Sequence, residues 1–436
     1  MPVRLLSAIL GIAAGALCFS TTATSASDGD AAAVAPLITA APTDFPDVKL
    51  SNRGSNGRVA FSPVDPRRLA VAIDDDPECS VRASADGGKT WRQPVRLPRL
   101  AGTDCNSRYG NGRPVVAYAT NGQLLYAAHR YRTFDPTYTT GVAVSVSADH
   151  GVTWSAPKSV FERPEEYDDI GVCDLHLVVA PDGPRVSVFS LFCGYSTVRT
   201  YLMSTVDQGK NWSAPKKITE NFKESFDGDW TQFSWAVGRG GVILVARAFW
   251  NDGGPGTAIF VGKSTDSGTT IAYNVADSDS GLWLDDPDIK IGAAGTAHLV
   301  YRKGDGIFYK FSLPPYNTWS AEAVRLDEQN PQGSPTEPRL ALGACAGSSV
   351  LHVTWVERLN AAKGGVFYSR RVARPGHPWS QPLKIGTFAQ GEWYEFVESD
   401  LAAAGPRAFS VFTGYPTPPQ IMHVRGSRVS SGVTCQ

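Results

Sequence analysis

The chain has 436 residues and a formal net charge of −1, and 19% of its residues are charged while 10% are aromatic. This near-neutral balance gives no electrostatic basis for binding nucleic acid or an anionic membrane surface. The high content of turn residues, with 43 Gly and 30 Pro, favours an all-β protein.

The first 26 residues have the pattern of a secretory signal peptide. Arg4 precedes an apolar run over residues 5–19, and small polar residues follow as far as Ala26. A basic start, a short apolar core and a small-residue exit describe such a peptide, and the run is too short to span a bilayer comfortably. We therefore expect cleavage near Ala26, a flexible leader over residues 27–44 and a single domain over residues 45–436. The mature protein is expected to be secreted, in the extracellular space or the periplasm.

Six cysteines follow the expected cleavage point: Cys79, Cys105, Cys173, Cys193, Cys345 and Cys435. An even number in an exported chain predicts disulfides. If residues 182–184 form a three-residue hairpin loop, Cys173 and Cys193 face each other across two strands. Proximity in sequence pairs Cys79 with Cys105, which leaves Cys345 with Cys435. The cysteine spacings do not fit a zinc site, and we expect no metal or other cofactor.

An eight-residue pattern, SADGGKTW at residues 84–91, recurs along the chain. Its copies begin at Ser147, Thr205 and Ser264, and the four aspartates in them are Asp86, Asp149, Asp207 and Asp266. The gaps between these aspartates are 63, 58 and 59 residues, and Trp319 and Trp379 continue the spacing with a gap of 60. A fixed period of this size indicates a repeat architecture.

Each period contains four strand-like segments separated by turn residues. In the second period these segments are residues 113–122, 123–131, 140–151 and 154–160. Four antiparallel strands per repeat form one blade of a β-propeller. Seven first strands are expected at residues 57–63, 113–119, 174–180, 231–237, 288–294, 338–344 and 399–405. We favour seven blades, with six as the alternative. The last unit lacks a fourth strand, which residues 45–51 can supply, so that no sheet edge is left open.

The repeated aspartates are expected to hold turns and to take no part in catalysis. The glycines in the pattern suit positive φ, the carboxylate can accept backbone N–H groups of its own turn, and the Trp can pack between blades. A catalytic site needs one constellation, whereas this unit is distributed around a ring.

The pattern Ser/Thr-x-Asp-x-Gly-x-Thr-Trp resembles the Asp-box, or BNR repeat, of the sialidase (neuraminidase) superfamily. The resemblance implies a glycan site at the axial face, where the first strands begin. It also implies three arginines on the substrate carboxylate, an aspartate as acid/base, and a tyrosine nucleophile. By this resemblance Arg58 is the first arginine, Arg247 is the second, and Arg358 or Arg302 is the third. Each can equally be an exposed arginine at a strand end.

The catalytic positions match this family only in part. In the acidic loop at residues 74–76, Asp76 is the candidate proton donor, although the loop also suits a solvated or cation-binding role. Glu398 occupies the place of the tyrosine, and Tyr394 lies four residues earlier. A carboxylate at that place suits a neutral sugar, with Asp76 and Glu398 as the acid and the nucleophile.

Further polar residues at first-strand starts can face the axis: Asp174, His176, Gln232, Asp286, Asp288, Glu337 and Arg339. Aromatic residues in or near loops can add flat surfaces for sugar rings: Trp230, Trp250, Trp393 and Tyr394. Aromatic platforms combined with a few placed polar groups are typical of carbohydrate sites.

Three functions are compatible with the sequence, because the fold alone does not settle activity. The leading one is a sialidase-like glycoside hydrolase that acts on chain ends, with an acidic sugar as substrate. The second is a propeller that binds glycan or protein without catalysis. The third is a polysaccharide lyase with Tyr394 or His176 as base. We expect a monomer whose partner is a glycan or glycoconjugate, with no nucleic acid and no membrane span.

Overall fold

The computed structural model describes the chain from residue 37 onward, with gaps. The described residues are 37–38, 40–75, 78–105, 113–133, 139–164, 169–194, 198–218, 233–250, 257–327, 334–345, 348–357, 365–374, 377–387, 399–414 and 423–435. They belong to one compact unit, Val34–Gln436, and the expected signal peptide lies outside them. Within these ranges, no helix is both long enough and apolar enough to cross a membrane.

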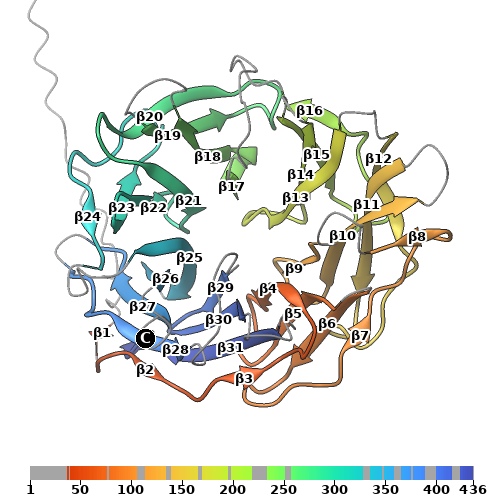
Figure 1. The fold of residues 1–436 in the computed structure, drawn as a ribbon, viewed down its shortest axis with the longest axis horizontal. Helices are drawn as coiled ribbons and strands as arrows, with labels where there is room; N and C mark the ends of the chain where they lie inside the picture. Colours follow the sequence, from red (N-terminus) through yellow and green to blue (C-terminus); the bar gives the residue numbers. More distant parts are fainter. Residues whose placement is uncertain are drawn as a thin grey trace, which may run out of the picture. The chain divides into compact units, whose positions relative to one another are not determined.

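Seven antiparallel sheets surround a central axis in Figure 1. Blade 1 contains β4 (Ser55–Phe61), β5 (Leu69–Asp74), β6 (Cys79–Ser84) and β7 (Val95–Arg96). Blade 2 contains β8 (Thr103–Asp104), β9 (Val115–Tyr118), β10 (Leu125–Thr133), β11 (Thr139–Ser147) and β12 (Lys158–Pro164). Blade 3 contains β13 (Asp169–Val179), β14 (Val186–Gly194), β15 (Val198–Thr205) and β16 (Lys216–Ile218).

The remaining blades continue in chain order. Blade 4 contains β17 (Phe233–Val237), β18 (Ile243–Trp250), β19 (Thr257–Ser264) and β20 (Ala272–Asp279). Blade 5 contains β21 (Leu284–Ile291), β22 (Ala297–Lys303), β23 (Gly306–Ser312) and β24 (Val324–Arg325). Blade 6 contains β25 (Pro335–Cys345), β26 (Ser348–Glu357), β27 (Gly365–Val372) and β28 (Leu383–Thr387). Blade 7 contains β29 (Ser399–Ala404), β30 (Arg407–Gly414) and β31 (His423–Ser430).

The N-terminal segment completes blade 7, as the sequence predicts. Both β2 (Thr43–Asp44) and β3 (Val48–Lys49) pair with β31. In addition, β1 (Leu37–Ile38) pairs with β32 (Val433–Thr434), so strand pairing reaches into the segment expected to be a leader. The all-β fold and seven blades are thereby confirmed, and the six-blade alternative is wrong.

The hydrophobic core lies between neighbouring blades. Strand residues that face the adjacent sheet are apolar and buried, which matches the alternating pattern of half-buried strands. Trp235 of blade 4, for example, stacks on Phe189 of blade 3 with ring centroids 4.3 Å apart. Trp91 of blade 1 packs against Phe409 of blade 7 at 5.2 Å, so the ring of blades is closed by aromatic contact as well as by strand pairing.

The four copies of the eight-residue pattern form the turns between third and fourth strands, and we call them the aspartate turns (residues 84–91, 147–154, 205–212 and 264–271). In the first, Asp86 accepts hydrogen bonds from Ser84 Oγ (2.8 Å), Lys89 N (3.0 Å), Thr90 N (2.9 Å) and Thr90 Oγ1 (2.6 Å). Gly88 has a φ of +84°, a conformation that favours glycine. Burial raises the pKa of Asp86, but the hydrogen bonds from Thr90, Ser84 and Lys89 outweigh it and lower that pKa to about 2.

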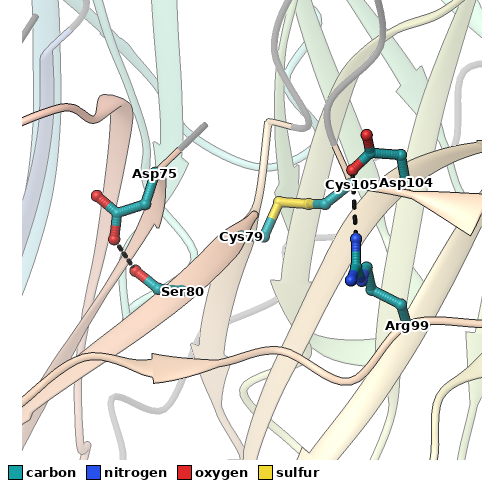
Figure 2. The surroundings of a disulfide bond; sticks show 6 residues. All are labelled: Asp75, Cys79, Ser80, Arg99, Asp104 and Cys105. Carbon is teal, nitrogen blue, oxygen red and sulfur yellow. Dashed lines mark hydrogen bonds and ion pairs between the residues drawn. A yellow bond between two sulfur atoms is a disulfide. The ribbon is translucent and has the colours of Figure 1, made fainter. Parts of the chain in front are cut away.

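Two predicted disulfides are present. Cys79, at the start of β6, is bonded to Cys105, which follows β8 (Figure 2). Cys345, at the end of β25, is bonded to Cys435, which follows β32. Cys173 is also disulfide-bonded.

The hairpin that carries Cys173 needs a correction. Ala180 N donates to Arg185 O (2.9 Å), so the loop contains four residues, 181–184, and the three-residue loop is wrong. A β-bulge lies between Val172 and Asp174, and the Cα partner of Cys193 is Gly171. The two cysteines are therefore not opposite each other in the ladder, and the side chain of Cys193 lies outside the described residues.

Candidate functional site

Seven first strands line the axis. Each contacts the first strand of the next blade, in the order β4, β9, β13, β17, β21, β25, β29 and back to β4. We call the polar side chains at or near the starts of these strands the axial mouth: Arg58, Arg113, Asp174, His176, Ser234, Asp286, Asp288, Glu337, Arg339 and Asp400. Because strands alternate in direction, the aspartate turns lie on the opposite face of the propeller. The turns and the mouth are therefore separate structures.

The backbone at the axial mouth is bent where several first strands begin. Asn56, Arg113, Asp286 and Glu337 have φ values of +52°, +40°, +51° and +54°. Three of them lie within register shifts, which run between Ser55 and Arg58, Asp285 and Asp288, and Thr336 and Arg339. Positive φ in a residue other than glycine costs on the order of 1–3 kcal/mol and is concentrated at functional sites. These bulges change the direction of side chains at the mouth.

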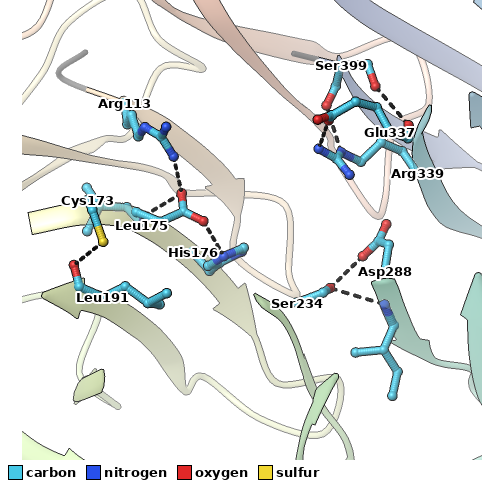
Figure 3. A network of polar contacts seen from close by, with 12 residues as sticks. Arg113, Cys173, Leu175, His176, Leu191, Ser234, Asp288, Glu337, Arg339 and Ser399 are labelled. Atoms are coloured by element: carbon cyan, nitrogen blue, oxygen red, sulfur yellow. Dashed lines mark hydrogen bonds and ion pairs between the residues drawn. The ribbon is translucent and has the colours of Figure 1, made fainter. Parts of the chain in front are cut away.

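One side of the mouth holds a linked arginine, aspartate and histidine. Asp174 Oδ1 accepts from Arg113 Nη1 (3.3 Å), and Asp174 Oδ2 is 3.1 Å from His176 Nε2. Burial raises the pKa of Asp174, but His176, Arg113 and Arg58 outweigh it and hold that pKa well below its usual range. The carboxylate is therefore ionised, and His176 must donate its Nε2 proton to it. Figure 3 shows Arg113 and His176 approaching one carboxylate from opposite sides.

Two aspartates join neighbouring first strands. Asp288 Oδ1 accepts from Ser234 Oγ (2.6 Å), as Figure 3 shows, and from Lys290 Nζ (2.5 Å). Asp288 Oδ2 accepts from Leu340 N (2.7 Å) in the next blade. Asp400 Oδ2 of blade 7 likewise accepts from Val59 N of blade 1 (2.8 Å). Burial raises the pKa of Asp288, but Lys290 and Arg339 outweigh it and lower that pKa.

The opposite side of the mouth is formed by blades 6 and 7. Arg339 Nε donates to Ser399 O (2.8 Å), and Arg339 Nη2 donates to Glu337. Ser399 Oγ donates in turn to Glu337 O (3.3 Å), as Figure 3 shows. Glu337 and Arg339 are thereby held in fixed positions facing the axis.

Asp286 is a carboxyl group of the mouth whose pKa is raised. Its Oδ2 accepts from Glu337 N (3.1 Å), and the residue is 5% exposed. Burial, together with the charge of Asp285, raises the pKa of Asp286 to about 6. Arg302 lies 3.5 Å from Asp285 and donates through Nε to Gly304 O (3.1 Å). Asp286 can therefore exchange a proton close to neutral pH.

The predicted arginines have different described partners. The positive charges of Arg113 and Arg58 lower the pKa of Asp174. Arg247 is 1% exposed, and its guanidinium lies 5.1 Å from the centroid of the Phe233 ring. Arg302 is paired with Asp285, and Arg358 lies outside the described residues. Convergence of these arginines near Asp76 stays a prediction, because Asp76 also lies outside them.

The structure does not describe several other residues of the predicted site either. Tyr394, Glu398, Gln232, Trp230 and Trp393 lie outside the described residues, as does the side chain of Trp250. In the acidic loop the described neighbour of Asp76 is Asp75, whose carboxylate accepts hydrogen bonds from Ser51 and Ser80. Figure 2 shows the bond from Ser80. Asp75 is thereby fixed to the start of blade 1.

Sequence reasoning missed three residues of the mouth: Arg113, Ser234 and Asp400. One signal for Arg113 was available. Arg113, Asp286 and Glu337 each directly precede a proline, and all three have positive φ. The other two have no local signal, because their roles come from contacts between blades.

The arrangement supplies a base, cations and a carboxyl group that titrates near neutrality. His176 can accept a proton at Nδ1, since Nε2 is committed to Asp174, and Arg113 and Arg58 can balance an anionic sugar. Within the described ranges, no group of three or more His, Cys, Asp or Glu side chains could hold a metal ion.

No protein-family model matches the chain, and a search of curated proteins found no match. Solved structures share its fold. An ulvan lyase, of a new family of polysaccharide lyase, is 12% identical over 89% of this chain and 98% of its own, with a TM-score of 0.57. The α-L-arabinofuranosidase Arb93A from Fusarium graminearum is 13% identical over 89% and 98%, with a TM-score of 0.51. The sialidase of Trypanosoma rangeli is 13% identical over 90% and 59%, with a TM-score of 0.47.

Proposed function

We propose that the chain is an exported enzyme that binds an acidic sugar of a polysaccharide at the axial mouth and cleaves the chain by β-elimination. The observation that carries the proposal is the arrangement of His176, Asp174 and Arg113. An ionised carboxylate fixes the histidine tautomer, and a cation stands next to the same carboxylate. This combination is suited to removing a proton next to a sugar carboxylate.

The proposed reaction uses these hydrogen-bonding atoms in turn. A uronate carboxylate at the mouth is balanced by Arg113 and Arg58, which makes the C5 proton more acidic. His176 Nδ1 takes this proton, and Asp174 stabilises the imidazolium that results. The electron pair of the C5–H bond forms a C4–C5 double bond as the C4–O bond breaks. The leaving oxygen then takes the proton from Nδ1, so the histidine returns to its starting state.

Two further observations support this proposal. The ulvan lyase with the same fold has been solved bound to a glucuronic acid–sulfated rhamnose repeat, with a TM-score of 0.58 to this chain. Disulfides form in oxidising compartments, and the described part of this chain contains two complete ones, which suits an exported protein.

A second candidate is hydrolysis of a glycoside, the function that the sialidase-like sequence pattern favours. The observation in its favour is Asp286, whose pKa is raised to about 6. A carboxyl group that is protonated near neutral pH is what a glycosidase needs as general acid. Asp76 and Glu398 are the other carboxyl groups proposed for this reaction.

The decisive experiment compares two readouts on the same substrates. Polysaccharides that contain uronic acids, a sialoside and neutral glycosides are incubated with the protein. Unsaturated products are followed by ultraviolet absorbance and new reducing ends by a colorimetric assay. Elimination gives both signals, hydrolysis gives reducing ends alone, and a protein that only binds glycans gives neither.

Variants then test the role of His176. We expect His176→Gln to lower kcat by roughly 100-fold or more, the contribution typical of a general base. His377→Gln is the matched control, because His377 lies in the connection between β27 and β28, on the face away from the mouth. Ultraviolet-absorbing product from the wild type, with equal rates for both variants, would exclude His176 as the base.

A further inference from the structure

A tryptophan outside the predicted site lies on the rim of the axial mouth. Trp283 directly precedes β21, the first strand of blade 5, and its side chain is 60% exposed. Asp285 and Asp286 follow it within three residues, so Trp283 is on the mouth face of the propeller. The neighbouring Leu282 is 46% exposed.

The backbone on both sides of Trp283 is held by hydrogen bonds. Thr257 Oγ1 donates to Leu282 O (2.8 Å) and accepts from Leu284 N (2.5 Å). The carbonyl of Trp283 accepts from Gly304 N (2.7 Å). The backbone that carries the ring is therefore in place before any ligand arrives, which lowers the entropy cost of binding.

The preceding turn is held as well. Asp279 Oδ1 accepts from Gly281 N (2.9 Å) and Leu282 N (3.1 Å), and Asp279 Oδ2 lies 3.2 Å from Lys303 Nζ. Lys303 ends β22, so the turn is fixed to the body of blade 5. Hydrogen bonds therefore hold the connection from blade 4 to blade 5 in place from residue 279 to residue 284.

An ion pair lies close to Trp283 along the chain and the sheet. Arg302 pairs with Asp285 (3.5 Å) and donates through Nε to Gly304 O, and Gly304 N donates to the carbonyl of Trp283. A flat apolar surface bordered by groups that can donate and accept hydrogen bonds matches the apolar face and the hydroxyl groups of a pyranose ring. A protein partner would need far more surface, about 800 Å² on each side.

We propose that Trp283 is a stacking platform for a sugar ring of the polysaccharide, adjacent to the sugar at the cleavage point, with Arg302 and Asp285 binding its hydroxyl groups. This inference rests on the proposed glycan function and adds a second binding position to it. A platform at this place makes the protein prefer long oligosaccharides to short ones.

The test is binding of acidic oligosaccharides of increasing length, measured by isothermal titration calorimetry. We expect Trp283→Ala to weaken binding of long oligosaccharides by roughly tenfold and to leave the shortest unchanged. Leu313→Ala is the matched control, because Leu313 is also 60% exposed but follows the end of β23, on the opposite face. Circular dichroism confirms that both variants are folded.

The outcomes separate this inference from the function on which it rests. If the wild type cleaves a polysaccharide but Trp283→Ala binds every length as tightly as the wild type, the platform is refuted and the function stands. An equal loss for all lengths would place Trp283 at the cleavage point and refute a separate position. A wild type that neither binds nor cleaves any glycan refutes both.

Discussion

The bond between Cys345 and Cys435 offers a quantitative test of how the ring is held closed. Replacing both cysteines with alanine removes a cross-link between residues 90 positions apart. Both side chains are only partly buried, so little packing is lost with the sulfur atoms. The main effect is expected in the unfolded chain, which gains conformational freedom when the loop is opened.

The magnitude follows from the loop length. For a closed loop of about 90 residues, the chain-entropy relation gives about 4.6 kcal/mol at 25 °C. Urea unfolding followed by tryptophan fluorescence measures this loss as a lower transition midpoint. The single variants Cys345→Ala and Cys435→Ala serve as internal checks, because each alone breaks the same cross-link and should cost nearly as much as the double variant.

Two results would contradict this reasoning. A loss of less than about 1 kcal/mol in the double variant would mean that the cross-link does not restrict the unfolded chain. Single variants whose losses add up to the loss of the double variant would mean that each cysteine acts through its own packing.

Three further predictions concern the aspartates. Asp400→Ala leaves the N–H of Val59 without its acceptor, so the free energy of unfolding should fall by about 1–3 kcal/mol in urea, while the exposed Asp305→Ala should change little. The pKa of Asp286 is raised to about 6, so ionisation of this group should lower the Tm of the wild type as pH rises from about 4 to 6. In calorimetry, the Tm of Asp286→Asn should fall less than that of the wild type over the same pH range. Because the pKa of Asp149 is lowered to about 2, Asp149→Asn should have a lower Tm than the wild type at pH 7, and this difference should shrink as pH falls to 2. The substitution should leave glycan cleavage unchanged.

The fold could be predicted from the sequence because its main signals are local and repeated. The Asp and Gly of each aspartate turn fix one hairpin through bonds within eight residues, as the contacts of Asp86 show. The spacing of that unit sets the number of residues in a blade, and this number determines how many blades the chain can form. The closure of blade 7 by residues 45–51 could also be predicted, because the last repeat lacks a fourth strand.

The axial mouth could be predicted only in part, because its contacts join residues far apart in sequence. Arg113 reaches Asp174 across 61 positions, and Asp400 reaches Val59 across 341. The predicted register of the hairpin after Cys173 is wrong by one residue next to the loop and by two at Cys193, since a bulge and a longer loop are not visible in the apolar pattern. Asp174, His176 and Asp286 were named as candidates, but their partners needed the structure.

The pairing of Leu37 with Thr434 brings these two residues side by side. A short peptide could connect the described strands at this point, and new ends could be opened at an aspartate turn, which lies on the face away from the mouth. Such a circular permutant would keep all seven blades and the same mouth.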